Sequence, residues 1–204
     1  ITSSSKNLIL DYKFNNTIDS NLLPTFNNSK PFEFEIEDTV EDTITRRKII
    51  AQTRPTKITF NASKALLEVL SIDISEVVDG IQMFESCTAL TSVKFNDRPT
   101  PKLISMERMF NKCTSLTNID FGGMTTENLK FLSATFSDCS VLETLDIGDW
   151  HVEQLEALSA TFRYSKRLKN LDLSKWKVNN LLYMSGAFRD CQQLEHIDLS
   201  GVKS

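Results

Sequence analysis

The sequence repeats itself every 26 residues over more than half of its length. A phenylalanine leads each unit and returns at that interval four times in succession, at Phe84, Phe110, Phe136, Phe162 and Phe188. A fixed period of this size is typical of repeat proteins, in which each unit buries its apolar side against the next. The period therefore restricts the fold to a stack of similar units.

Other columns keep step with the phenylalanines. Together they give the pattern F-x-x-C-x-x-L-x-x-[LIV]-x-[FIL], which occurs five times, with Ser165 once in place of the cysteine. The end of the pattern, as in "LTNIDF", alternates as a short strand does. The piece before each phenylalanine, as in "LSATF", has apolar residues at helical spacing.

These pieces predict a unit of strand, turn and short helix. Serines that could cap a helix lie near the start of the helical pieces, at Ser105, Ser133, Ser159 and Ser185. A period of 26 lies within the range of about 20–29 residues of leucine-rich repeats. We therefore expect an α/β repeat solenoid: a leucine-rich-repeat-like stack of short parallel strands and short helices with a β-rich N-terminal cap.

The repeat divides the chain into two predicted domains. A shorter unit at Leu67–Ile72 places the start of the solenoid of about five units at residue 60, so it covers 60–204. Residues 1–59 instead show strand alternation, with a hairpin expected from Phe32 to Ala51 around the turn "DTVED". This first part is either a cap that covers the end of the stack or a small docking module.

Composition and motifs exclude several classes of function. The net charge of −4 gives no electrostatic basis for nucleic-acid binding. No stretch approaches the roughly 18–20 apolar residues of a membrane span, so we expect no membrane insertion. The chain begins at Ile1 without the features of a signal peptide and ends within a repeat phrase, which indicates a processed chain or a fragment. No phosphate-binding loop, dinucleotide fingerprint or nucleophile motif is present, so we expect neither an enzyme nor a cofactor.

Four cysteines occupy one column of the repeat: Cys87, Cys113, Cys139 and Cys191. A ladder of buried free thiols is the favoured interpretation, because unpaired cysteine is a small and usually buried side chain. A disulfide between adjacent units, such as Cys113 with Cys139, is a second interpretation. A zinc site is disfavoured, because no CxxC is present and the chain has only two histidines.

An acidic row forms the first candidate ligand-binding surface. Between the inward apolar residues of the strands, the outward positions are Lys94, Asp120, Asp146, Asp172 and Asp198, beside the second outward column of Ser92, Asn118, Thr144, Asn170 and His196. Stacked strands would align these side chains on one exposed face. The row is either a ligand-binding face or a solvated surface held by hydrogen bonds; a calcium site is a third alternative.

Trp150 and Trp176 form the second candidate, because they share a column with Met124 and Val202. Exposed, two indoles one unit apart would offer a stacking surface for a sugar or a protein partner. Packed inward, they would close the edge of the core.

The segment "FRYSKRLKNLDLSKWKVNNLLYMSGAF" (162–188) resembles the repeat of the BspA-like leucine-rich-repeat surface proteins of bacteria, which follows "MFxxCxxLTxLDLSxFDTSxVTxMxxMF". The resemblance covers about residues 65–204 and includes the leading Phe, the Cys, the strand apolars and the Met before the next unit. Trp150 and Trp176 depart from the family's phenylalanine, and "TTEN" at 125–128 only loosely matches its "DTS" turn.

The resemblance implies a scaffold on exported proteins that serves adhesion or partner binding, without enzyme activity. We therefore expect a bacterial cell-surface adhesin-type binding module, located outside the cell, whose partner is a protein or glycan on a host or bacterial surface. Similar repeats occur in bacteriophage structural proteins, so a virion component that contacts other subunits of a larger assembly is the alternative.

Overall fold

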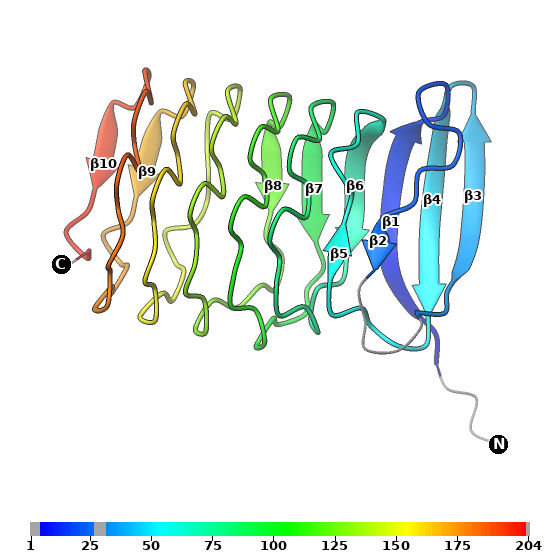
Figure 1. The fold of residues 1–204 in the computed structure, drawn as a ribbon, viewed down its shortest axis with the longest axis horizontal. Coiled ribbons are helices and arrows are strands. Elements are labelled where there is room, and N and C mark those ends of the chain that lie inside the picture. Colours follow the sequence, from blue (N-terminus) through cyan, green and yellow to red (C-terminus); the bar gives the residue numbers. More distant parts are fainter. Residues whose placement is uncertain (1–4, 27–31, 203–204) are drawn as a thin grey trace.

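The computed structural model describes residues 5–26 and 32–202, which form one elongated row of strands and turns (Figure 1). The described strands are β1 (Asn7–Asn15), β2 (Thr25–Phe26), β3 (Glu35–Glu41), β4 (Ile44–Ala51), β5 (Ile58–Thr59), β6 (Leu66–Ile72), β7 (Ser92–Phe95), β8 (Asn118–Asp120), β9 (Asn170–Asp172) and β10 (His196–Asp198).

An antiparallel sheet forms the N-terminal end of the row, in the order β3-β4-β1-β6. In β4, Thr45, Arg47, Ile49 and Ala51 alternate as buried residues, which is the period-2 pattern of a strand with one covered face. β3 and β4 form the expected hairpin, but its turn is shorter than predicted: residues 38–41 of the expected turn belong to β3, and the chain reverses at Asp42, where φ is 54°, and Thr43.

The same sheet continues into the repeats without interruption. β6 pairs in parallel with β7, and β7 with β8, so one six-stranded mixed sheet crosses residue 60. Further along the chain, β9 and β10 form a separate parallel pair. β2 and β5 form a third, two-stranded antiparallel sheet.

The predicted α/β solenoid with short helices is wrong. The described residues contain no helix, and their sheets are mixed rather than uniformly parallel. Consequently no helix in this part of the chain has the length and apolar character needed to cross a membrane. The serines expected to cap helices have no helix to cap.

The pieces that resemble helices are chains of consecutive turns, which we call turn ribbons and place at 80–86, 106–112, 132–138, 158–164 and 184–190. Within each ribbon, two residues four apart have a left-handed backbone: Gln82 and Ser86, Arg108 and Lys112, Ala134 and Asp138, Ala160 and Tyr164, and Gly186 and Asp190. A left-handed residue ends an α-helix. The apolar spacing of the ribbons therefore mimics that of a helix, but their backbone cannot form one.

The ribbons are held both by hydrogen bonds within themselves and by hydrogen bonds to the next unit. Within a ribbon, N–H groups such as those of Thr135 and Ser137 donate to carbonyls three residues earlier, at 3.1 and 3.2 Å. Alternate N–H groups, such as those of Leu132, Ala134, Phe136 and Asp138, donate to carbonyls 25 residues further on, at 2.7–2.9 Å. We call the units coil 1 (79–104), coil 2 (105–130), coil 3 (131–156), coil 4 (157–182) and coil 5 (183–202). Each interface between successive coils contains four such forward bonds.

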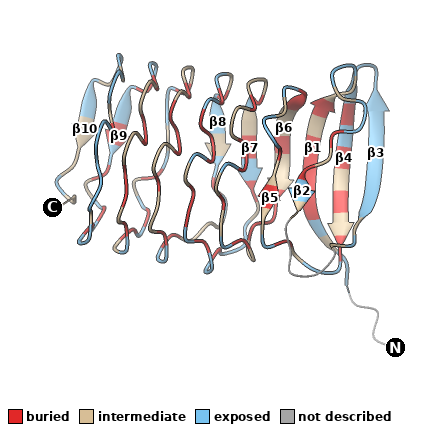
Figure 2. Cartoon of the chain, viewed as in Figure 1, coloured by how far each residue is buried: buried red, intermediate tan, exposed pale blue. Residues whose placement is uncertain are grey.

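One continuous core runs through the whole molecule (Figure 2). Its axis is a stack of phenyl rings with centroids 5.3–5.8 Å apart, formed by Phe60, Phe84, Phe110, Phe136, Phe162 and Phe188. The sequence repeats its phenylalanine because each ring packs against the equivalent ring of the next coil.

Candidate binding groove on the strand face

Three of the four aspartates in the predicted acidic row have the same local role. The Oδ1 atoms of Asp120, Asp172 and Asp198 each accept a hydrogen bond of 2.9 Å from the backbone N–H two residues later. This bond holds the turn that follows each strand. At Asp120 the donor is Gly122, whose left-handed φ of 54° and close approach to the Asn96 carbonyl leave no room for a side chain.

Asp146 differs from the other three. In the part of the chain that the structure describes, its carboxylate makes no hydrogen bond or ion pair, although its side chain is exposed on the same face. No structural role therefore accounts for this carboxylate.

The strand face is interrupted at Asp146. Residues 144–146 form no strand, and no backbone hydrogen bond joins them to β8 within the described residues. On the opposite side, the ribbons of coils 2 and 3 remain bonded, for example through the Phe110 N–H group, which donates to the Thr135 carbonyl at 2.9 Å. The row is thus continuous along its ribbons and open along its strands between β8 and 144–146 (Figure 1).

A groove of about 570 Å³ lies at this interruption. Its polar rim consists of Asn118, Asp120, Asp146 and Asp149, and its apolar floor consists of Ile119, Phe121, Met124 and Trp150. The floor is more accessible than equivalent parts of the core: Ile119 is half-buried, whereas Val93 and Leu171 in the same column are 1% exposed. The groove therefore combines negative charge with an aromatic and aliphatic surface.

Positive side chains lie at both ends of the groove. Lys94 Nζ is 3.3 Å from Asp120 Oδ2, and Lys175 Nζ is 2.6 Å from Asp149 Oδ1. The N–H bond from Gly122, together with Lys94, lowers the pKa of Asp120 below its ordinary value. Asp120 is therefore ionised at neutral pH. Among the described residues, Asp120 and Asp149 each form an ion pair, whereas Asp146 forms none and contributes only weakly to the raised pKa of Lys175.

The structure brings four predicted site residues together: Asn118, Asp120, Asp146 and Trp150 line the groove. It places Asn170 and Asp172 on β9, and His196 and Asp198 on β10, beyond the groove. There, hydrogen bonds from Ser174 and Ser200 lower the pKa values of Asp172 and Asp198.

The two tryptophans lie in the core. Trp176 is fully buried, and its indole N–H donates to the Ile147 carbonyl at 2.8 Å. Trp150 is 8% exposed, stacks on Trp176 at 6.3 Å, and meets Phe121 edge-on at 4.9 Å. The indoles therefore close the edge of the core, and only a margin of Trp150 contributes to the groove floor.

The cysteine column is also structural. Cys113 Sγ donates to the Phe84 carbonyl at 3.1 Å, and Cys139 Sγ donates to that of Phe110 at 3.3 Å. Ser165 Oγ makes the equivalent bond to Phe136 at 2.7 Å, which explains the one substitution in the column. All four cysteines are free, and burial raises the pKa of Cys87 to about 12, so the thiols remain protonated.

Sequence reasoning missed part of the groove. Asp149 was not among the predicted residues, although it stands in the turn "GDW" directly before Trp150. The interruption of the sheet was not predicted either.

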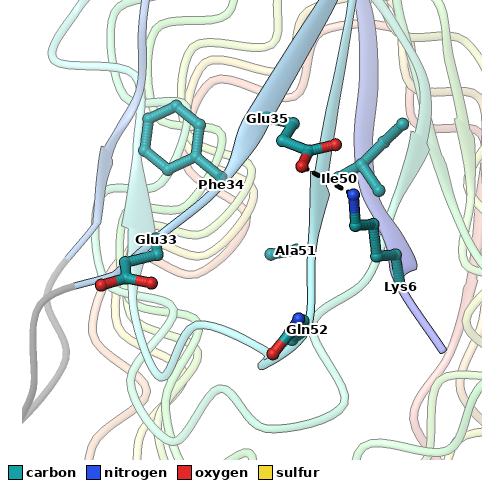
Figure 3. A pocket seen from close by; sticks show the side chains of 7 residues that line it. All are labelled: Lys6, Glu33, Phe34, Glu35, Ile50, Ala51 and Gln52. Carbon is teal, nitrogen blue, oxygen red and sulfur yellow. Dashed lines mark hydrogen bonds and ion pairs between the residues drawn. The ribbon is translucent and has the colours of Figure 1, made fainter. Parts of the chain in front are cut away.

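A second pocket, of about 220 Å³, lies at the other end of the molecule (Figure 3). It is formed by the start of β1 and by β3 and β4, and Lys6 faces Glu35 across it at 2.6 Å. This pair neutralises its own charge, and the pocket contains none of the residues of the repeat. We therefore place the candidate site at the strand-face groove.

The lining of the groove contains three carboxylates and one side-chain amide, and no serine, cysteine, lysine or histidine is among its residues. Among the described residues, no group of three or more His, Cys, Asp or Glu side chains could hold a metal ion.

Comparison with known proteins identifies a family but no function. A family model described as "Mycoplasma protein of unknown function, DUF285" matches residues 21–145 and 79–202, two overlapping ranges of which the first alone covers more than half of the chain. No curated protein and no solved structure matches the chain. On the strength of the family model, this repeat protein with an open groove between its second and third coils belongs to the DUF285 family.

Proposed function

We propose that this protein is a non-enzymatic protein-interaction module, of adhesin type, which acts on a bacterial cell surface and binds a protein or glycan through the groove between β8 and 144–146. One observation carries the proposal: the strand face opens where Asp146 has no structural partner and where Ile119 of the core is only half-buried. Elsewhere along the row, the equivalent carboxylates hold turns.

The lining of the groove indicates the chemistry of the partner. Carboxylates on the rim would bind a cationic side chain or the hydroxyl groups of a sugar. The margin of Trp150 and the side chains of Ile119 and Phe121 offer apolar contact beneath them. Binding sites commonly pair such an apolar floor with a few polar groups that fix orientation.

The location outside the cell rests on the resemblance of the repeat to those of BspA-like surface proteins. In that family the repeat is a scaffold for adhesion, and no catalytic role is attached to it. The free thiols serve as hydrogen-bond donors within the core, so the proposed function assigns them no redox role.

The test is binding of the labelled chain to intact host cells and to bacterial cells. Asp146→Asn with Asp149→Asn removes the rim charge without changing side-chain size. We expect binding to fall at least tenfold and the remaining binding to lose its salt dependence. Pretreatment of the cells with protease or with glycosidases separates a protein partner from a glycan.

The matched control is Asp172→Asn with Asp198→Asn, which removes the same charge from the same row outside the groove. It should leave binding within about twofold of the unmodified chain. Equal losses in the two double variants would show that net charge, and not the groove, determines binding, and the proposed site would then be wrong.

A second candidate function is a structural part of a phage virion. The exposed apolar side chains of the last coil, such as Tyr183 at 61% exposed, favour it because they are suited to contact another subunit. Light scattering on the native protein tests this alternative: a large symmetric assembly supports the virion role, and a monomer near 23.2 kDa supports the adhesin role.

A further inference from the structure

The strand β3 (Glu35–Glu41) lies at an edge of the six-stranded sheet. Within the part of the chain that the structure describes, it pairs only with β4, and all seven of its residues are exposed. Figure 2 shows β3 exposed along its whole length at the N-terminal end of the row. An edge strand of this kind presents backbone N–H and C=O groups that a further strand can bind.

The register of the hairpin determines which backbone groups of β3 face the open edge. Two residues join β3 to β4, so Glu41 and Ile44 form the hydrogen-bonded pair that closes the hairpin, and every second pair after it is also hydrogen-bonded. The other side of β4 agrees with this alternation, because the Asn16 N–H group donates to the Thr43 carbonyl at 2.8 Å. The backbone groups that point away from β4 are therefore those of Ile36, Asp38 and Val40.

The two faces of β3 carry different side chains. Ile36 and Val40 lie on the face toward the core, because their partners in β4, Ile49 and Thr45, are buried. Nevertheless, Val40 is 62% exposed and Ile36 is 42% exposed. The residues on the outer face are Glu35, Glu37, Thr39 and Glu41. The edge therefore combines exposed apolar side chains on one face with negative charge on the other.

Part of this negative charge is already paired. Asp38 binds Arg47 and Glu35 binds Lys6, each at 2.6 Å. Two carboxylates of the strand form no ion pair or side-chain hydrogen bond within the described residues, namely those of Glu37 and Glu41. Both side chains are exposed, so both are available to a cationic partner.

The neighbouring basic side chains of the outer face stand on β4, one strand in from the edge. Arg46 is already bound by Asp11 through two hydrogen bonds, of 2.7 and 2.9 Å. Lys48 is opposite Glu37 in the register, but the two side chains form no ion pair. A strand added at the edge would meet Glu37 from the side that β4 does not occupy.

The charge of β3 disfavours a second copy of the same strand as the occupant. Antiparallel pairing of β3 with itself, centred on Asp38, would place Asp38 opposite Asp38 and Glu35 opposite Glu41. Like charges directly opposite each other destabilise a strand pair. The same charge favours a strand with basic side chains on its outer face, so charge complementarity selects a partner of different composition.

We propose that the free edge of β3 docks an extended segment of a partner protein in which basic and apolar residues alternate. The backbone of that segment binds the outward groups of Ile36, Asp38 and Val40 and adds a strand to the sheet. Its apolar side chains contact Ile36 and Val40, and its basic side chains bind Glu37 and Glu41. The edge and the groove lie at opposite ends of the six-stranded sheet, so this is a second binding surface.

The probe is a seven-residue peptide, the length of β3, in which lysine and valine alternate and lysine stands at both ends. Amide hydrogen exchange is measured on the intact chain with and without saturating peptide. We expect the amides of Ile36, Asp38 and Val40 to exchange at least about tenfold more slowly with the peptide, because each gains a hydrogen bond. The amides of Glu37 and Thr39, which already bond to β4, should change little. A peptide of the same composition with its lysines grouped in pairs is the control and should protect none of the three.

Two further peptides test whether the backbone takes part. N-methylation of the three valines removes the N–H groups of one edge of the peptide, and N-methylation of the two middle lysines removes those of the other edge. Only one edge of a docked strand faces β3. We therefore expect one of these peptides to lose binding, measured by fluorescence anisotropy, and the other to keep it.

Variants of the chain test the charge. Glu37→Gln with Glu41→Gln should weaken binding of the alternating peptide by at least about fivefold, because two exposed ion pairs are lost. The matched control is Glu127→Gln with Glu195→Gln, which removes two exposed carboxylates from the row, away from β3. It should leave binding within about twofold of the unmodified chain.

Three results would overturn the proposal. Equal protection by the peptide with paired lysines would show that net charge alone attracts it. Binding that survives N-methylation of either edge would show that no strand is added. Protection of the outward amides that rises with the concentration of the chain, without any peptide, would show that the occupant is a second copy. Because binding through the groove does not enter these measurements, their failure leaves the proposed function untouched.

Discussion

The N-terminal sheet and the row of coils build one core by opposite means. In the sheet, strands of seven to nine residues pair with partners distant in sequence, as β1 (Asn7–Asn15) does with β4 and β6. In the row, segments of three or four residues pair only with the coil before and the coil after. The sheet therefore depends on many long-range contacts at once, whereas the row depends on a sum of neighbouring interfaces.

Charge follows the same division. In the sheet, bidentate pairs join arginine to aspartate, as Arg47 does to Asp38 at 2.6 and 2.7 Å, with Arg47 buried. In the row, exposed lysines reach carboxylates 26 residues away, as Lys175 reaches Asp149 and Lys169 reaches Glu143. Exposed pairs of this kind contribute about 0–1 kcal/mol each, so the row is held mainly by its apolar stack and backbone bonds.

The largest expected effect tests whether damage stays local in the row. Phe136→Ala removes a buried ring from the middle of the stack and should cost about 3–5 kcal/mol of unfolding free energy, measured by urea denaturation. Amide exchange should accelerate in coils 2 to 4 before it does in β1 and β4. Phe188→Ala, at the half-buried end of the stack, is the control and should cost less. Uniform acceleration across both regions would contradict the division into a cooperative sheet and a modular row.

The next effect concerns the junction between the two regions. Asp73 is 1% exposed on its side chain and lies 2.7 Å from Arg54 and 3.5 Å from Arg98. Burial alone would raise the pKa of Asp73, but hydrogen bonds from Ser75 and the contact with Arg54 outweigh it and lower that pKa below 3.8.

Since the folded pKa is depressed, the stability from Asp73 is present above the unfolded pKa and is lost as the pH falls through the folded one. Asp73→Asn should therefore cost about 1.5–3 kcal/mol at pH 7, and the difference from the unmodified protein should shrink below about pH 4. Thermal unfolding at pH 7 and at pH 3 measures this. A difference that does not change with pH would mean that packing, and not charge, accounts for the loss.

A smaller effect tests the hydrogen-bonded column of the row. Ser165→Ala removes the bond to the Phe136 carbonyl and should cost about 1–2 kcal/mol, whereas Ser165→Cys should cost less than about 1 kcal/mol. Cys139→Ser is the reciprocal control. If Ser165→Ala proved as stable as Ser165→Cys in urea denaturation, the small size of the side chain in the cysteine column, and not its hydrogen bond, would account for the choice of residue.

The smallest effect concerns the left-handed positions of the ribbons. Ala160 has φ of 55°, and the equivalent residue in coil 5 is Gly186, with φ of 63°. Ala160→Gly should raise stability by roughly 0.5 kcal/mol and Gly186→Ala should lower it by about 1 kcal/mol, because glycine adopts this backbone without steric cost. Thermal unfolding measures this: a midpoint temperature that rises in Ala160→Gly and falls in Gly186→Ala confirms the backbone strain. A fall in both variants would show that the greater conformational entropy of glycine in the unfolded chain dominates at residue 160.

The sequence predicts the columns better than it predicts the backbone. The spacing of phenylalanine, cysteine and leucine follows from the need of each unit to cover its neighbour, and the structure stacks these residues as the period requires. The helices were wrong because apolar spacing does not reveal backbone handedness. Of the ten paired left-handed residues, six are Gln, Arg, Lys, Ala or Tyr, types that do not indicate a turn, and only Ser86, Asp138, Gly186 and Asp190 are turn-favouring types.

The site shows the same limit. Alternation within the strands placed the aspartates on one face, but nothing in the period separates Asp146 from Asp120, Asp172 and Asp198. The difference arises from tertiary packing, since the ladder stops between β8 and 144–146 while the ribbons continue. The hydrogen bonds between strands stop at this point while those between ribbons continue, and side-chain types alone do not reveal such a difference.

The uniform interface between ribbons has an evolutionary consequence. Every coil in the middle of the row presents equivalent carbonyls to the coil before it and equivalent N–H groups to the coil after it. Any such coil can therefore form the same hydrogen bonds at any other position in the row. Duplication or deletion of a 26-residue segment within the gene would therefore lengthen or shorten the row by one step while keeping every remaining contact. In such a lineage, the distance between the N-terminal sheet and the groove could change by recombination alone, without a compensating mutation in either.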